Sequence, residues 1–206
     1  MIKAVIFDID GVLIDSADAN VESYRRLLTK HGHRPLTKYE YVKISHMTMK
    51  QTIRLAAEEA TDEEVEAIWI DGKNTPPPFE LYKIPPFVNE TLPILHEKYK
   101  LALVSNRTKN GIRNYLHFAK TDAYFSVRIS SEDITHPKPH PESLFLAAKE
   151  LGVEPSECVY VGDTRSDLLS AKAAGMRTIL YTEKKITGAE YHTASFREIP
   201  ALIEGL

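Results

Sequence analysis

The 206-residue chain has one cysteine, no excess of positive charge and no long apolar run, and each scarcity excludes a class of protein. A single thiol, Cys158, excludes an internal disulfide and any metal site built from several thiolates. It lies in an apolar run, so we expect a buried, unreactive side chain. The formal net charge of −3 gives no reason to expect binding to nucleic acid or to a membrane surface. The apolar run at residues 4–7 is too short for a signal sequence or a membrane span, and we expect a cytoplasmic protein.

Four short aliphatic runs alternate with helical patterns along most of the chain: residues 4–7, 101–104, 158–161 and 178–181. Apolar residues recur at helical spacing from Val88 and again after Pro141, and Gly152 and Gly175 supply helix stops. This alternation of strands and helices predicts an α/β fold with a doubly wound parallel sheet that is buried on both faces.

Residues 16–84 show helical periodicity but no strand-like run. The segment closes on consecutive prolines, residues 76–78, which cannot continue a helix and are typical of a linker. We therefore expect a small helical cap at 16–84, inserted after the first strand of a core made of residues 1–15 and 85–206. One continuous domain with an irregular helical layer is the alternative.

The first strand-like run leads directly into Asp8 and Asp10, which Gly11 follows. Carboxylates are costly to bury without a partner, and parallel sheets bind ligands at the carboxyl ends of their strands. Gly11 permits a sharp turn and a close approach to a ligand. Taken alone, the pattern also fits solvated acids at a strand end.

Ser105 and Lys138 are candidate binding groups for an anion. Ser105 follows the second run and precedes an expected helix, so it fits either a helix N-cap or an anion site. Lys138 lies between two prolines, which favours a fixed cation of the kind that a reacting phosphoryl group requires. An ordinary surface lysine is the alternative.

Asp163 and Asp167 form a second pair of acids after the third run. Their spacing places both on one side of a helix start. Carboxylate oxygens are the ligands that Mg²⁺ prefers, although acids at a helix N-terminus are also favourable without a metal.

If the strands are parallel, the three strand-end motifs and the lysine meet at one edge of the sheet. In this order they resemble the haloacid dehalogenase superfamily of phosphotransferases, and the resemblance covers nearly the whole core. It is strongest for the branch with a helical cap after the first strand, which includes phosphoglycolate phosphatase and β-phosphoglucomutase. The stretch from Lys138 through Asp163 and Asp167 to Met176 is especially similar to that branch.

The resemblance implies a role for each acid. In the family, the acid at the position of Asp8 attacks phosphorus and becomes an aspartyl-phosphate. The acid at Asp10 protonates the leaving oxygen and then activates water, which implies a raised pKa. Mg²⁺ is the implied cofactor, held by Asp8, the backbone carbonyl of Asp10 and Asp163, with Asp167 supporting the metal or its waters.

The same resemblance implies that Ser105, Lys138 and the backbone amide of Asn106 hold the phosphoryl oxygens. Asp10 implies a phosphate bound through oxygen, because dehalogenases and phosphonatases of the family lack this second acid.

The cap resembles the family least. Mutases carry a glycine and an arginine in a cap loop that binds a second phosphate, and the corresponding residues 44–50 contain neither, which favours a hydrolase. His46 and Lys50 in this segment, and Arg107 in the core, are candidate substrate contacts, with ordinary surface residues as the alternative.

We therefore expect a Mg²⁺-dependent phosphomonoester hydrolase, monomeric or homodimeric, that acts on a small phosphorylated metabolite such as phosphoglycolate or a sugar phosphate. A sugar-phosphate mutase like β-phosphoglucomutase and a catalytically silent binding protein on the same fold are the alternatives.

Overall fold

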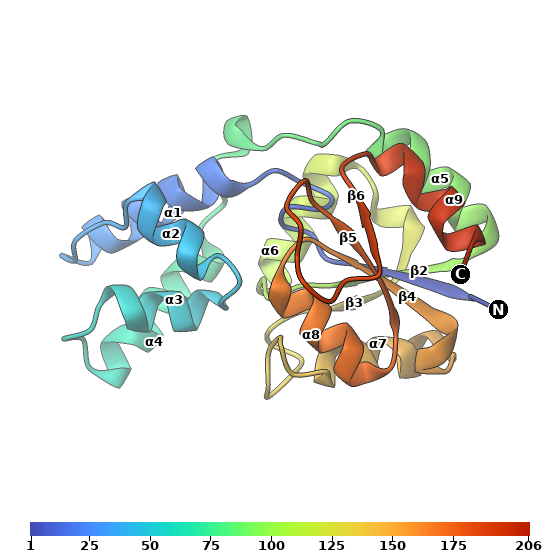
Figure 1. Ribbon diagram of the computed structural model, residues 1–206. Coiled ribbons are helices and arrows are strands. Elements are labelled where there is room, and N and C mark those ends of the chain that lie inside the picture. Colours follow the sequence, from blue (N-terminus) through green and yellow to red (C-terminus); the bar gives the residue numbers. More distant parts are fainter.

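A six-stranded sheet lies at the centre of the computed structural model, which describes all residues, 1–206 (Figure 1). The strand order is β3-β2-β1-β4-β5-β6, and every neighbouring pair is parallel. The strands are β1 (Ala4–Phe7), β2 (Lys100–Val104), β3 (Phe125–Ile129), β4 (Cys158–Gly162), β5 (Arg177–Tyr181) and β6 (Tyr191–Thr193). The predicted α/β parallel sheet is confirmed.

The four predicted runs correspond to β1, β2, β4 and β5, whereas the two edge strands were not predicted. In β3, buried and exposed residues alternate, so the strand lacks a continuous aliphatic run. The strand β6 has only three residues. Because an edge strand is covered less completely than a central one, its sequence carries a weaker signal.

Helices cover both faces of the sheet, and the side chains of β1 alternate between them. Val5 and Phe7 pack in one hydrophobic cluster, and Ala4 and Ile6 pack in another. The first cluster includes side chains of α5 (Val88–Lys98), α6 (Lys109–Ala119) and α9 (Ile199–Glu204). The second includes side chains of α7 (Glu142–Leu151) and α8 (Arg165–Ala174).

The predicted start of α7 and the predicted ends of α7 and α8 are confirmed. Pro141 immediately precedes α7, and Gly152 and Gly175 end α7 and α8 in the left-handed backbone conformation. Cys158 is buried in β4, and burial raises the pKa of its thiol to about 11, in line with the unreactive side chain expected.

Four helices between β1 and α5 lie to one side of the sheet: α1 (Ala17–Lys30), α2 (Lys38–Ile44), α3 (Met49–Ala56) and α4 (Asp62–Asn74) (Figure 1). We call these helices the cap. They enclose their own hydrophobic cluster, formed entirely by residues between Tyr24 and Ile68. Thr37, Thr48 and Thr61 begin α2, α3 and α4 with capping boxes, which satisfy the first backbone N–H groups of these short helices.

Two connections join the cap to the sheet, and they pair with each other through the backbones of Asp15 and Lys83. The N–H of Asp15 donates to the carbonyl of Lys83 (2.8 Å), and the N–H of Lys83 donates to the carbonyl of Asp15 (3.2 Å).

No helix of the chain combines the length and the apolar character needed to cross a membrane.

Candidate active site

The three acid and hydroxyl motifs follow neighbouring strands of the sheet. Asp8 follows β1, Ser105 follows β2 and Asp163 follows β4, and β1 lies between the other two strands. Because all three strands run in the same direction, their carboxyl ends place these residues at one edge. The convergence expected from the motif order is therefore present in the fold.

A cavity of about 350 Å³ lies between this edge and the cap. Predicted site residues and cap residues line it together: Asp8, Asp10, Ser105, Asn106, Arg107, Lys138 and Asp163 from the core side, and Asn20, Tyr24, Tyr41 and His46 from the cap. Lys50 does not line the cavity; its ammonium pairs with Glu66 on the surface of the cap. The structure thus brings His46 and Arg107 to the site and leaves Lys50 outside it.

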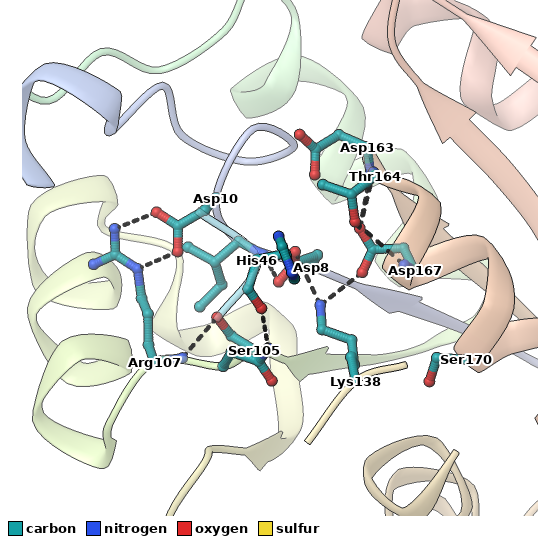
Figure 2. A network of polar contacts seen from close by, with 12 residues as sticks. Asp8, Asp10, His46, Ser105, Arg107, Lys138, Asp163, Thr164, Asp167 and Ser170 are labelled. Carbon is teal, nitrogen blue, oxygen red and sulfur yellow. Dashed lines mark hydrogen bonds and ion pairs between the residues drawn. The ribbon is translucent and has the colours of Figure 1, made fainter. Parts of the chain in front are cut away.

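Lys138 is a buried cation between two carboxylates (Figure 2). Its Nζ lies 3.0 Å from Asp8 Oδ2 and 2.7 Å from Asp167 Oδ1, and it donates to the Tyr160 hydroxyl at 2.9 Å. Burial by itself lowers the pKa of Lys138, but Asp167 and Asp8 raise it above its ordinary value. The side chain is only 4% exposed, so the alternative of an ordinary surface lysine is wrong.

Asp167 has no capacity left for a direct metal bond. One carboxylate oxygen accepts from Lys138 and from the Tyr160 hydroxyl, and the other accepts from Thr164 and from the backbone N–H of Asp163. Burial opposes its charge, but Lys138 and Thr164 hold the pKa of Asp167 below its ordinary value. Asp167 therefore orients Lys138 and fixes the turn that carries Asp163.

Asp8 and Asp163 carry more negative charge than the chain itself compensates. Their carboxylate oxygens, with one of Asp167, lie within 4.8 Å of one another, and Asp163 Oδ1 is buried without a hydrogen-bond partner. Burial raises the pKa of Asp8 to about 7, with Asp167 and Asp10 adding to it against Lys138. Burial and the nearby Asp167 and Asp8 raise the pKa of Asp163 well above its ordinary value. Oxygen donors with this uncompensated charge fit a divalent cation such as Mg²⁺.

Gly11 brings the loop after β1 close to these acids. Its φ is +76°, and a Cβ at this position would overlap the Asp163 carboxylate. Only glycine combines this backbone conformation with such an approach.

Ser105 is buried and is not a helix N-cap. Thr108 caps α6 instead, because its Oγ1 accepts from the backbone N–H of Gly111 at 3.1 Å. The Ser105 hydroxyl accepts from the N–H of Arg107 at 3.3 Å and keeps its own proton to donate to a ligand. The backbone N–H of Asn106 donates no hydrogen bond within the chain, while its side-chain amide donates to the carbonyl of His46 in the cap (2.6 Å).

Asp10 forms a bidentate ion pair with Arg107 (Figure 2). Arg107 Nε donates to Asp10 Oδ2 and Nη2 donates to Oδ1, each at 2.7 Å, while Ser16 and Asn20 also donate to the carboxylate. Burial alone raises the pKa of Asp10, but Arg107 and these donors hold it below the ordinary value. The expectation of a raised pKa is therefore wrong for this form of the protein.

Several of these partners carry no signal in the amino-acid sequence. Ser16 and Asn20 are polar residues at a helix start, and Tyr160 is one more buried position of a strand. Of the three, only Tyr160 offers a local hint, because a buried tyrosine needs a hydrogen-bond partner for its hydroxyl.

A family model described as haloacid dehalogenase-like hydrolase matches residues 5–181. The chain belongs to this family. The resemblance seen in its motifs is confirmed, and so is the prediction of an enzyme of the phosphatase kind.

Two curated relatives are each 30% identical to the chain. One is the pyrophosphatase PpaX of Anoxybacillus flavithermus, aligned over 86% of this chain and 82% of its own length. The other is a phosphoglycolate phosphatase of Pseudomonas fluorescens, aligned over 98% of this chain and 75% of its own length.

Two solved structures share the fold of the chain. A haloacid dehalogenase-superfamily hydrolase from Geobacter sulfurreducens superposes with a TM-score of 0.79 at 30% identity, over 98% of this chain and 100% of that one. CbbY from Rhodobacter sphaeroides, solved with phosphate, superposes with a TM-score of 0.84 over 97% of this chain and 96% of that one. At 20% identity, the likeness to CbbY concerns the fold alone.

Proposed function

We propose that the protein is a Mg²⁺-dependent phosphomonoester hydrolase that acts on a small phosphorylated metabolite through an aspartyl-phosphate on Asp8. The observation that carries the proposal is the pair of Asp8 and buried Lys138, 3.0 Å apart on the cavity wall beside the unpartnered carboxylate oxygen of Asp163. A nucleophilic carboxylate repels an anionic phosphate, so the reaction needs cationic groups at this point.

Asp8 attacks phosphorus with one carboxylate oxygen while the bond from phosphorus to the leaving oxygen breaks. Asp10 leaves Arg107, takes up a proton from solvent and gives it to that oxygen, and the alcohol departs. Asp10 then takes a proton from a water molecule that attacks phosphorus, the bond to Asp8 breaks, and inorganic phosphate leaves. Asp8 returns to its starting form.

Ser105, Lys138 and the Asn106 backbone N–H would hold the phosphoryl oxygens. Both the Ser105 proton and the Asn106 N–H are available to a ligand, and Lys138 is fixed by Asp167 and Tyr160. Hydrogen-bond donors fixed before the reaction stabilise developing charge without a cost of reorganisation at that moment.

Asp8 and Asp163 would hold Mg²⁺ with the backbone carbonyl of Asp10, and Asp167 would orient the turn behind them. The bound ion supplies positive charge against the repulsion between the Asp8 carboxylate and the phosphate. An oxygen-only donor set that leaves room for waters suits Mg²⁺ in particular.

The substrate proposed is phosphoglycolate or another small phosphate monoester. Pyrophosphate, an anhydride whose leaving group is phosphate instead of an alcohol, is a second candidate. The relatives that are 30% identical to the chain are named for phosphoglycolate and for pyrophosphate. A cavity of about 350 Å³ has room for a ligand of this size.

Turnover of an aryl phosphate by Asp8→Asn tests the mechanism. We expect no turnover above background in the presence of Mg²⁺, with an unchanged circular dichroism spectrum. Asp62→Asn, on a side chain that is 94% exposed in the cap, is the matched control and should retain full activity. Acid-quenched wild-type enzyme should carry label from a ³²P-phosphate substrate on the peptide that contains Asp8. Undiminished turnover in Asp8→Asn would end the proposed mechanism.

A further inference from the structure

We propose that Arg107 is a specificity-determining residue that binds a second anionic group of the substrate, a carboxylate or a second phosphate, in place of Asp10. The inference rests on the proposed function and deepens it. It adds the chemical class of the substrate: a phosphate ester or anhydride that carries another negative charge beside its leaving oxygen.

Arg107 is a largely buried cation, and each of its three guanidinium nitrogens makes a hydrogen bond in this structure. Its side chain is 11% exposed; Nε and Nη2 bind the two oxygens of Asp10, and Nη1 donates to the Tyr82 hydroxyl at 2.7 Å. Asp10 is the only anionic partner of this guanidinium. The planar fork of an arginine fits any carboxylate or phosphate in the same way.

The backbone of Arg107 is held beside the proposed phosphate site. The backbone N–H of Arg107 donates to the Ser105 hydroxyl oxygen (3.3 Å). The backbone carbonyl of Arg107 accepts from the backbone N–H and the hydroxyl of Ser131 (2.9 and 3.1 Å). Both Arg107 and Ser105 line the cavity. In Figure 2 the Arg107–Asp10 pair lies on the opposite side of Asp8 from Lys138. Arg107 is thus anchored beside the proposed phosphoryl site, on the side away from Lys138.

Asp10 cannot be the anionic partner of Arg107 and carry the proton for the leaving oxygen at the same time. Arg107 engages both carboxylate oxygens, and Ser16 and Asn20 donate to one of them as well. When Asp10 turns to the leaving oxygen, Arg107 becomes a buried cation without an anion, which is unfavourable. A substrate with a second negative charge supplies the missing anion, whereas a neutral leaving group does not.

A purely structural role for Arg107 makes a different prediction. If the ion pair served only to hold the loop after β2, its loss would lower kcat/KM for every substrate by the same factor. A role in recognition instead changes the ratio between charged and neutral substrates, because only the charged ones contact the guanidinium.

Two matched substrate pairs test the proposal with the full-length enzyme and Mg²⁺. The first pair is phosphoglycolate and its neutral amide; the second is the bisphosphate and the monophosphate of ethylene glycol. They distinguish a carboxylate from a phosphate as the second anion. The variants are Arg107→Met, Arg107→Lys as the conservative replacement, and Arg113→Met as a control that removes the same charge from an exposed position of α6.

We expect the wild type and Arg113→Met to prefer the charged member of at least one pair by about tenfold or more in kcat/KM. Arg107→Met should abolish this preference, mainly through a higher KM for the charged substrate, and Arg107→Lys should restore part of it. Equal losses on both members, or no preference in the wild type, would overturn the proposal; the wild-type comparison stands even if a variant fails to fold. If an aryl phosphate is hydrolysed while the preference is absent, this inference alone fails. If no phosphate is hydrolysed, the proposed function fails with it.

Discussion

Replacing Asp8 by asparagine should stabilise the metal-free protein, and the gain should grow with pH. Asp8 has a pKa of about 7 in the folded chain against an ordinary value of 3.8. Between these values the folded state keeps a proton that the unfolded state releases. The free energy of unfolding of the wild type therefore falls as pH rises through this range. An asparagine does not ionise, so the variant escapes this loss.

The magnitude follows from the two pKa values. A rise from 3.8 to about 7 corresponds to about 4 kcal/mol once the pH exceeds 7, at about 1.4 kcal/mol for each pH unit. Asparagine offers one acceptor where Asp8 accepts from both Ile9 and Lys138, which costs about 1 kcal/mol at every pH. That cost cancels when two pH values are compared. The stability of Asp8→Asn relative to wild type should thus improve by about 3–4 kcal/mol between pH 4 and pH 8.

The assay is urea denaturation in EDTA at several pH values from 4 to 8. Asp62→Asn, whose carboxylate is 94% exposed, serves as the control and should follow the wild-type curve. Adding Mg²⁺ at pH 8 should restore stability to the wild type more than to Asp8→Asn, because the cation favours the ionised carboxylate. Parallel curves for wild type and Asp8→Asn would refute the claim that burial holds Asp8 protonated near neutral pH.

Three further substitutions test the surroundings of Asp8. Lys138→Met leaves two buried carboxylates without their cation and should lower the free energy of unfolding by about 3–5 kcal/mol at pH 8 in urea titrations, whereas exposed Lys149→Met should change it little. Equal stability of the two variants would contradict the buried ion pairs. Tyr160→Phe removes the hydroxyl between Lys138 and Asp167 and should lower the free energy of unfolding by about 1 kcal/mol in the same titrations. The variant should also have a lower kcat on aryl phosphate. An unchanged kcat would show that the hydroxyl does not position Lys138. Gly11→Ala should weaken Mg²⁺ binding in calorimetry, because the added Cβ would overlap the Asp163 carboxylate. Gly152→Ala is the control, since Gly152 has the same left-handed backbone (φ +66°) but open space around it. Similar Mg²⁺ affinity in both variants would argue against a metal at Asp163.

The sequence alone was sufficient for the central strands and for the order of the motifs. Strands β1, β2, β4 and β5 are covered on both faces, so their residues form aliphatic runs that are visible without a structure. The ends of α7 and α8 were equally visible, because proline and glycine restrict the backbone at Pro141, Gly152 and Gly175. Parallel strands then place Asp8, Ser105 and Asp163 at one edge of the sheet as a matter of topology.

The edge strands and the cap residues that face the cavity could not be predicted from the sequence. The alternating residues of β3 and the three residues of β6 carry too weak a pattern to separate them from loops. Lys50 and His46 lie four residues apart in the same cap segment, yet only His46 lines the cavity. Which cap residues face the core depends on how the cap docks, and the local sequence does not encode that contact.

The pairing of the charged groups was decided by the tertiary structure. The sequence predicted Asp8, Asp10, Lys138 and the two later acids as site residues, because strand ends and proline-bounded loops limit where these residues can lie. It did not determine that Arg107, 97 residues from Asp10 along the chain, would bind both of its oxygens. Long cationic side chains reach several possible partners, and only the folded chain sets which carboxylates are buried within reach and therefore which pKa values rise or fall.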